Sequence, residues 1–183
     1  EESGESHLTI DDILLETGVS KGSLYYHFGD REGLIYAARI AQYSSYLEND
    51  SEELRSGLLT CTTFDQFVEN LLGLTILSMQ KNDRKIRAMR LNAISSAYGR
   101  PDLWYALQEK QHQYTNAITE VFEYGQKMGW VRTDVTAHAL GVFVQGHALS
   151  RILVDLDHNE LEAESWVKVM KLTFDVIFTA PAK

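Results

Sequence analysis

Proline is nearly absent from this chain, and this absence constrains the fold more than any other feature. The 183 residues include two prolines, Pro101 and Pro181, and the second lies among the last three residues. Because proline breaks helix interiors, a chain with a single interior proline can form long uninterrupted helices. No stretch combines two-residue alternation of apolar and polar side chains with turn signals. We therefore predict an all-α fold without strands.

Helix start signals divide the first part of the chain into three helices. Each predicted helix follows a polar side chain that can accept a hydrogen bond from the free amides of the first turn. These N-caps are Thr9, Ser20 and Asp30. Asp12 completes a capping box with Thr9, and Gly18 ends the first helix. The second helix is short and runs to about Tyr26, with Leu24 and Phe28 facing inward, and the third runs to about Glu48.

Longer helices are predicted for the remainder of the chain, after a polar link at residues 49–57. Thr63 and Gln66 begin one helix, and Pro101 stands where proline is favoured, at the first position of another. Asp134 is the expected cap of a strongly apolar segment. The expected helices cover 63–79, 84–98, 101–128, 137–156 and 160–179. This organisation predicts two domains, residues 1–48 and residues 49–183.

The segment Thr9–Leu34 has the spacing of a helix-turn-helix, with Gly18 at the turn and Val19 and Leu24 as apolar contacts. A recognition helix must approach base edges closely, so its leading residues should be short, polar or basic. Ser20, Lys21, Gly22 and Ser23 fit this requirement. Tyr25, Tyr26 and His27 follow at the far end, where hydroxyl and imidazole donors can reach backbone phosphates, and Arg31 begins the next helix. Taken singly, the tyrosines could be packing aromatics and Lys21 a solvated lysine.

The sequence SKGSLYYHFGDREGL, residues 20–34, is similar to the signature of the tetracycline-repressor-like (TetR) family of bacterial transcription regulators. The resemblance implies a three-helix DNA-binding head, whose first helix should precede residue 8 and is only partly present here, and a larger helical domain that binds a small molecule and dimerises. It implies a repressor released from operator DNA by a small-molecule ligand. The DNA-binding residues it implies are Thr9, Ser20, Lys21, Gly22, Ser23, Tyr25, Tyr26, His27 and Arg31.

Net charge favours a competing interpretation. The formal charge is −9, and residues 1–50 hold ten acids and three bases, or −7. An acidic balance speaks against nucleic acid as a partner, although phosphate contact depends on the local surface. The alternative is a helical ligand-binding protein or enzyme without a DNA role.

Candidate ligand-binding residues are the aromatic, methionine and interleaved polar side chains of the central helices, although such residues at helical spacing are more often core. They are Phe67, Met79, Met89, Asn92, Trp104, Gln111, Tyr114, Phe143 and His147. A separate segment, residues 81–90, holds five bases. It could receive an acidic ligand or pair with the acidic head, but a solvated helix face is the favoured interpretation.

A two-fold dimer is expected because one recognition helix reads too few base pairs, and operators are read in half-sites. The segments 137–156 and 160–179 combine apolar and small residues at helical spacing and would form a four-helix bundle with their symmetry mates. These faces could also bury only against their own chain. The interface candidates are Leu140, Gly141, Val144, Ala148, Trp166, Met170 and Phe174.

Several function classes lack their motifs in this sequence. The six histidines include no pair spaced four apart, and the single cysteine, Cys61, allows no intramolecular disulfide or cysteine-cluster zinc site. There is no glycine-rich phosphate loop. We expect no enzyme activity, no cofactor and no metal. We expect no membrane segment either, because no apolar run reaches about 18 residues, and we expect a cytoplasmic protein.

Overall fold

The computed structural model describes residues 9–77, 82–158 and 163–178, and every regular element in these ranges is an α-helix. The predicted all-α fold is therefore confirmed for this part of the chain. The helices are α1 (Ile10–Thr17), α2 (Lys21–Phe28), α3 (Arg31–Leu58), α4 (Phe64–Leu77), α5 (Asn82–Ala97), α6 (Pro101–Lys127), α7 (Ala137–Ser150), α8 (Ile152–Leu156) and α9 (Ala163–Phe178).

Three helices begin where the capping chemistry predicts. The Thr9 hydroxyl accepts from the backbone amide of Asp12 at 3.2 Å, and the Asp12 carboxylate accepts in return from the Thr9 amide, which makes a capping box. Ser20 Oγ accepts from the Ser23 amide at 3.1 Å. Asp30 Oδ1 accepts from the Gly33 amide at 2.8 Å. Local hydrogen bonding therefore fixes the starts of α1, α2 and α3.

The helix α3 is about ten residues longer than the sequence predicts. The polar stretch 49–57, expected to be a link, continues the helix to Leu58. Tyr43, Leu47 and Leu58 are buried along one face of α3, and this packing stabilises a helical turn that its polar residues alone would not favour. The predicted domain boundary between residues 48 and 49 thus falls inside a continuous helix.

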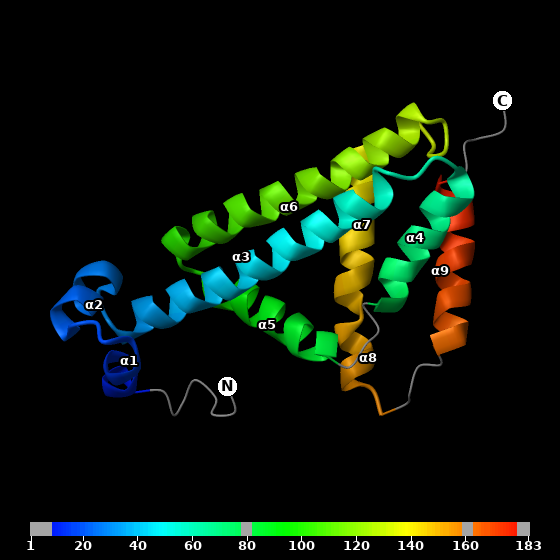
Figure 1. Cartoon of the computed structure of the whole chain (residues 1–183). Coiled ribbons are helices and arrows are strands. Elements are labelled where there is room, and N and C mark those ends of the chain that lie inside the picture. The colour runs from blue at the N-terminus through cyan, green and yellow to red at the C-terminus, as the bar shows by residue number, and fades with distance from the viewer. Residues whose placement is uncertain (1–8, 78–81, 159–162, 179–183) are drawn as a thin grey trace.

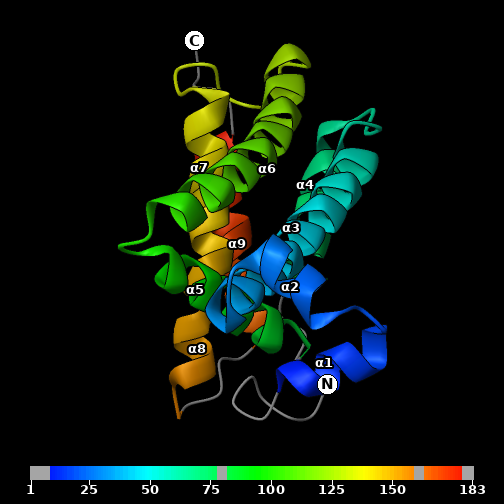
Figure 2. The same ribbon diagram turned by 90° about the vertical axis from the view of Figure 1, so that its left-hand side faces the viewer.

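The helices α1 and α2 form a small head at one end of the molecule, and the remaining helices form the body (Figure 1). The helix α3 leads from the head into the body, where it packs along α6, which in turn packs on α7. The helix α4 packs on α9 at the far end. A view with the head facing the reader shows α2 directly in front of α3 (Figure 2). The head therefore meets the body through the first turns of α3.

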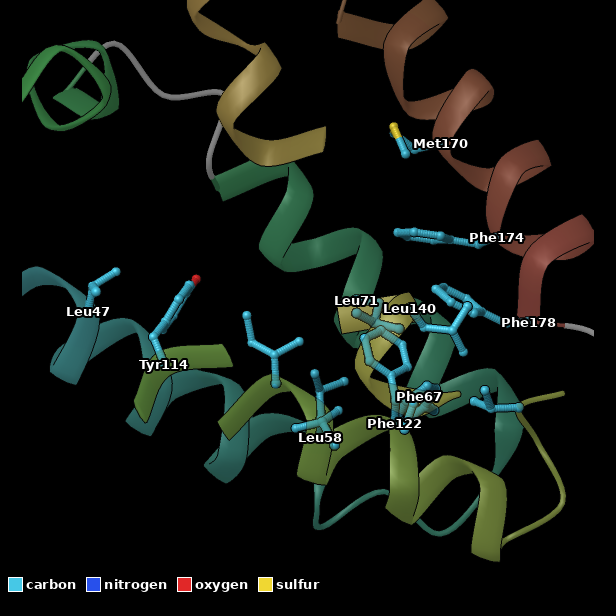
Figure 3. Close-up of a cluster of buried hydrophobic side chains, with 14 of the residues drawn as sticks. Leu47, Leu58, Phe67, Leu71, Tyr114, Phe122, Leu140, Met170, Phe174 and Phe178 are labelled. Carbon is cyan, nitrogen blue, oxygen red and sulfur yellow. The ribbon is translucent and has the colours of Figure 1, made fainter. Parts of the chain in front are cut away.

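Aromatic and aliphatic side chains from six helices form the core of the body, and Figure 3 shows part of this core. Phe174 lies 5.0 Å from Phe178 between ring centroids, and Phe178 lies 5.1 Å from Phe122. Phe67 is fully buried and faces Trp130 at 5.9 Å. In the head, by contrast, Leu24 is the one buried residue of α1 and α2, and Phe28, expected to face inward, is 38% exposed.

The apolar segment 137–156 is divided in two at Arg151, which separates α7 from α8. Its cap is Thr136, whose side chain accepts from the Ala139 amide at 3.2 Å, and not Asp134 as predicted. By length and composition alone this segment is apolar enough to cross a membrane. One such helix is weak evidence for a membrane segment, because helices of soluble proteins pass the same test.

Candidate nucleic-acid interface

Two glycines with left-handed or related backbone conformations reverse the chain between the helices of the head. Gly18 has a φ of 68° and donates its amide hydrogen to the Leu14 carbonyl at 2.9 Å, which ends α1. Gly29 has a φ of 76° and donates in the same way to Tyr25. Residues with a Cβ atom rarely adopt these values. The two glycines therefore set the directions in which α2 leaves α1 and α3 leaves α2.

A third glycine, Gly33, allows the end of α2 to lie against the first turn of α3. A Cβ atom on Gly33 would stand 1.9 Å from the carbonyl oxygen of Phe28, far inside any possible contact distance. The obstacle is backbone, so no side-chain rotation could relieve it. Gly33 lies within the signature at residues 20–34, but its role could not be recognised from the sequence.

The first turn of α2 presents the residues that sequence analysis assigned to base edges. Lys21, Gly22 and Ser23 are all exposed, while Leu24 is 3% exposed and holds the opposite face of α2 inside the head. A Cβ on Gly22 would meet no atom closer than Ser20 Oγ at 3.9 Å. Packing within this chain therefore gives no reason for a glycine at residue 22. Close approach of a partner to the outer surface of α2 would give one.

The second half of α2 carries three adjacent rings. Tyr26 is 85% exposed, Tyr25 is 38% exposed, and His27 is exposed with its ring centroid 5.3 Å from that of Tyr26. Arg31, also exposed, begins α3 beside them. Hydroxyl, imidazole and guanidinium groups thus lie at the end of α2 opposite to Lys21, as a phosphate-contacting set would require.

Thr9 has a different local role from the one that the resemblance implies. Its hydroxyl both accepts from the Asp12 amide and donates to the Asp12 carboxylate. A phosphate at the start of α1 would have to compete with this carboxylate for the hydroxyl hydrogen. In the described structure Thr9 acts as the N-cap of α1.

The first turns of α3 are joined to the turn between α5 and α6. The Arg100 guanidinium lies over the ring of Tyr36 at 4.0 Å and 3.6 Å from the Glu32 carboxylate. One turn further along α3, the Arg39 guanidinium donates to Ser96 Oγ near the end of α5. These contacts connect the head-proximal part of α3 to a helix of the body.

A cavity of about 90 Å³ lies inside the body, several times the space that one water molecule requires. Its wall is mostly aliphatic and comes from α3, α4, α5, α6 and α7. Among the predicted ligand residues, Tyr114 and His147 line it. Gln111 is hydrogen-bonded to Gln145, another lining residue, at 2.5 Å.

The structure does not bring the other predicted ligand residues to this cavity. Phe67 is in the core and Met89 is half-buried elsewhere. Asn92, Trp104 and Phe143 are exposed. Met79 lies outside the described residues. Among the residues that the structure describes, no three histidine, cysteine or acidic side chains gather as metal ligands would.

Two bases of the segment 81–90 are buried, which corrects the favoured interpretation of this segment as a solvated helix face. Arg87 is 6% exposed and Arg90 is 7% exposed, whereas Arg84 and Lys85 are exposed. Arg90 lines the cavity. The signal was present in the sequence, because Arg87 and Arg90 continue the helical spacing of the buried Ala93 and Ala97.

The predicted interface residues mostly pack within their own chain. Leu140, Met170 and Phe174 are 3%, 3% and 1% exposed, and Gly141 is buried against α6. Val144 and Ala148 line the cavity, and Trp166 stacks on His147 at 5.0 Å. The same helices leave other apolar residues exposed: Val142, Phe143, Leu153, Leu156, Val169 and Leu172.

Comparisons with known proteins agree with this geometry. Residues 1–38 match the family model described as bacterial regulatory proteins, tetR family. A search of curated proteins gives no match. Among solved structures, Salmonella enterica GusR is 19% identical with a TM-score of 0.64, covering 97% of this chain and 88% of that one.

Two further solved structures have the same fold. One, described as a putative tetR-family transcriptional regulator from Mesorhizobium loti, is 17% identical with a TM-score of 0.66 and covers 94% of this chain and 86% of that one. The other is the ketosteroid transcriptional regulator KstR2 of Mycobacterium tuberculosis, 14% identical with a TM-score of 0.59, covering 95% and 86%. At these identities the likeness shows the fold.

Proposed function

We propose that this chain is a DNA-binding transcriptional regulator of the tetR family, whose family model matches residues 1–38, and that it is a dimeric repressor that a small molecule releases from its operator. Members of this family are in general not enzymes. Operator DNA lies in the bacterial cytoplasm, and we assign the protein to the same compartment.

The observation that carries the proposal is the outer surface of α2. Its first turn offers an exposed lysine, glycine and serine, and its second half offers two tyrosine hydroxyls and an imidazole. Lys21 is suited to a guanine edge and Gly22 to close approach. Tyr26 and Arg31 are suited to backbone phosphates. This division of roles supports recognition of duplex DNA through the major groove.

Substitutions can separate the two roles. Lys21→Ala should weaken operator binding by about 1–3 kcal/mol and flatten the base preference at one position. Arg31→Ala should weaken binding to all DNA sequences by the same factor and lower the dependence of binding on salt concentration. The control is Lys127→Ala, at an exposed position at the far end of α6, which should change neither the base preference nor the overall affinity for DNA. Retardation of DNA from the region upstream of the gene measures these effects, and unchanged specificity in Lys21→Ala would refute the assignment.

Contacts between α5 and the first turns of α3 support release by a ligand. The cavity is lined by Arg90 of α5, and the same helix ends near Ser96, which accepts from Arg39 of α3. The guanidinium of Arg100, just beyond α5, lies over the Tyr36 ring and forms an ion pair with Glu32. A ligand that shifts α5 would therefore shift the start of α3 and with it the separation of two heads in a dimer.

The exposed apolar residues of α7, α8 and α9 support the dimer. Exposed apolar side chains such as Phe143, Leu153 and Leu172 are costly to leave in water and typical of an interface. The interface we propose uses this outward face and not the buried residues Met170 and Phe174.

Sedimentation tests the interface. The chain should be a dimer at micromolar concentration, and Phe143→Glu combined with Val169→Glu should make it a monomer. Tyr105→Glu, at a 68% exposed position on α6, should remain a dimer. A natural chain that sediments as a monomer, or a double variant that remains a dimer, would contradict this interface.

A further inference from the structure

The buried face of α5 holds two arginines with different surroundings. Arg87 and Arg90 lie one turn apart, and both are more than nine-tenths buried. Arg87 makes a two-pronged ion pair with Asp155 of α8, with Nε at 2.6 Å and Nη2 at 2.7 Å from the two carboxylate oxygens. Its charge is therefore compensated within the chain.

Arg90 has no such compensation. Among the residues that the structure describes, none of the ion pairs involves Arg90. Its guanidinium lies 5.6 Å from the ring centroid of Tyr46 and 5.9 Å from that of Tyr114. Burial raises the pKa of Tyr43, and the charge of Arg90 and its hydrogen bond to Tyr43 partly oppose this rise. The Nε–H of Arg90 has no hydrogen-bond partner.

A buried guanidinium N–H without an acceptor is costly, because its hydration is lost and not replaced. Aromatic rings offset part of this cost through cation–π attraction, but they do not accept a hydrogen bond as a carboxylate does. Arg90 lines the 90 Å³ cavity. The missing acceptor can therefore come from a molecule inside the cavity.

The other ionisable groups of the cavity leave this role to Arg90. The Asp50 carboxylate accepts a hydrogen bond from the Tyr114 hydroxyl. Burial, with a further contribution from Asp50, raises the pKa of Tyr114 well above its ordinary value, so this phenol stays protonated at neutral pH. Burial and then the nearby charge of Arg151 lower the pKa of His147, so its imidazole is neutral at pH 7.

The remaining wall of the cavity is mostly aliphatic, and Tyr46, Phe122 and Gln145 also line it. Leu54, Leu58, Leu71, Leu74 and Val144 surround the space. Such a wall favours a hydrocarbon body, and a few convergent polar groups then fix its orientation. The Asp50 carboxylate also lines the cavity but accepts from the Tyr114 hydroxyl. The mostly aliphatic wall and the unpartnered guanidinium N–H of Arg90 together describe a molecule with one acidic end.

We propose that the ligand of this cavity is a small organic acid, whose carboxylate binds the Arg90 guanidinium and whose hydrocarbon body lies against the leucines of α3 and α4. The unpartnered Nε–H has no surface open to the empty cavity, so the Arg90 side chain has to turn toward the carboxylate for this group to donate to it. This inference rests on the proposed function, because it specifies the chemical class of the molecule that releases the repressor.

Calorimetry and thermal unfolding of the full chain test this assignment with straight-chain carboxylates from propanoate to hexanoate. Each carboxylate is compared with the primary alcohol of the same chain length at the same pH and ionic strength. At least one carboxylate should bind and raise the Tm, and its alcohol should bind at least ten-fold more weakly. Equal binding of alcohol and carboxylate, or no binding of any carboxylate, would overturn the proposal.

Substitution of Arg90 locates the site. Arg90→Met should weaken carboxylate binding about 10- to 100-fold, because a hydrogen-bonded ion pair is lost. It should also fold, since it removes a buried charge without an acidic partner. Arg90→Lys, which keeps the charge but not the planar fork, is a second variant with intermediate binding. Arg84→Met, an exposed arginine on the same helix, is the control and should bind as the natural chain does. Unchanged affinity in both Arg90 variants would overturn the proposal.

Retardation of DNA by the chain in the absence of any carboxylate tests the DNA-binding role independently of the proposed ligand. If the chain retards DNA but binds no carboxylate, the ligand class is wrong and the regulator remains. If a carboxylate binds through Arg90 but does not weaken the DNA complex, the site is correct and release by this ligand is wrong.

Discussion

The head and the body of this protein are held together by different kinds of interaction. In the helices α1 and α2, one residue is buried, and the caps Thr9, Ser20 and Asp30 and the glycines of the turns fix the geometry. In the body, side chains from six helices pack into one core, and a buried ion pair joins α5 to α8. The head therefore depends on local backbone geometry, and the body depends on long-range packing.

Because of this difference, the head and the body contribute to function in different ways. A head with little core of its own can present most of α2 to DNA, but its orientation depends on the first turns of α3. The body supplies the stability, the cavity and the exposed apolar residues that we propose pair with a second copy. All three tryptophans, at positions 104, 130 and 166, lie in the body, so their fluorescence reports its unfolding separately from DNA binding by the head.

Removal of the buried ion pair should have the largest effect on the body. Asp155→Asn leaves Arg87, whose side chain is 8% exposed, without its carboxylate, and should lower the free energy of unfolding by about 3 kcal/mol. Denaturant unfolding followed by tryptophan fluorescence measures this loss. The control is Glu120→Gln, which breaks the exposed pair with Arg55 and should cost less than about 1 kcal/mol. Equal losses in the two variants would mean that burial does not distinguish these pairs.

A methyl group at residue 33 should disable the head and spare the body. In Gly33→Ala the new Cβ would collide with the Phe28 carbonyl, so α2 must move relative to α3. We expect DNA affinity to fall about 100-fold or more, while the unfolding of the body changes little. Gly57→Ala, on the same helix with nothing within 4 Å of its Cβ, should keep full DNA affinity. If Gly33→Ala binds DNA normally, the α2–α3 junction does not orient the recognition helix.

A methyl group at residue 22 should have opposite effects on folding and on binding. Alanine is up to about 1 kcal/mol more favourable than glycine in a helix, and the position is open in the free protein. Gly22→Ala should therefore keep or raise thermal stability while weakening operator binding by about 1 kcal/mol or more, because α2 can no longer approach the bases as closely. Retardation and thermal unfolding of the same samples measure both effects. Unchanged DNA binding would show that this turn does not enter the groove.

Acid should reduce the contribution of the buried pair. The hydrogen bond from Arg87 lowers the pKa of Asp155 in the folded protein below its value of about 3.9 in the unfolded chain. A lowered pKa contributes stability that is fully present above pH ~4 and is lost as the pH falls through the folded-state pKa. The difference in unfolding free energy between the natural chain and Asp155→Asn should therefore be constant from pH 5 to 7 and narrow below pH 4. A difference that widens in acid would contradict this assignment.

Local chemistry explains which parts of the fold the sequence could predict. Caps and turn glycines act over three or four residues, so the starts of α1, α2 and α3 and the place of Pro101 follow from neighbouring residues alone. The extension of α3 through residues 49–57 does not, because its polar residues have no local reason to stay helical. It depends on Leu47 and Leu58 packing against helices far away in the sequence.

The sites divide in the same way. The exposed turn of α2 is a local feature, and the structure presents Lys21, Gly22 and Ser23 to solvent as the sequence suggested. The cavity is formed by five helices, so most of its lining could not be predicted one helix at a time. Arg90 was missed because a lysine- and arginine-rich segment is ordinarily solvated. Its burial depends on Tyr43, Tyr46 and Tyr114 of α3 and α6, which surround it.

Selection of DNA from a random pool by the full chain tests the central claim, that the head reads duplex DNA and the body pairs two heads. We predict enrichment of two inverted half-sites whose centres lie about one helical turn, ~34 Å, apart or at a multiple of it. The monomeric variant Phe143→Glu with Val169→Glu should enrich single half-sites or nothing. Recovery of no common sequence from the natural chain at low salt would contradict the account.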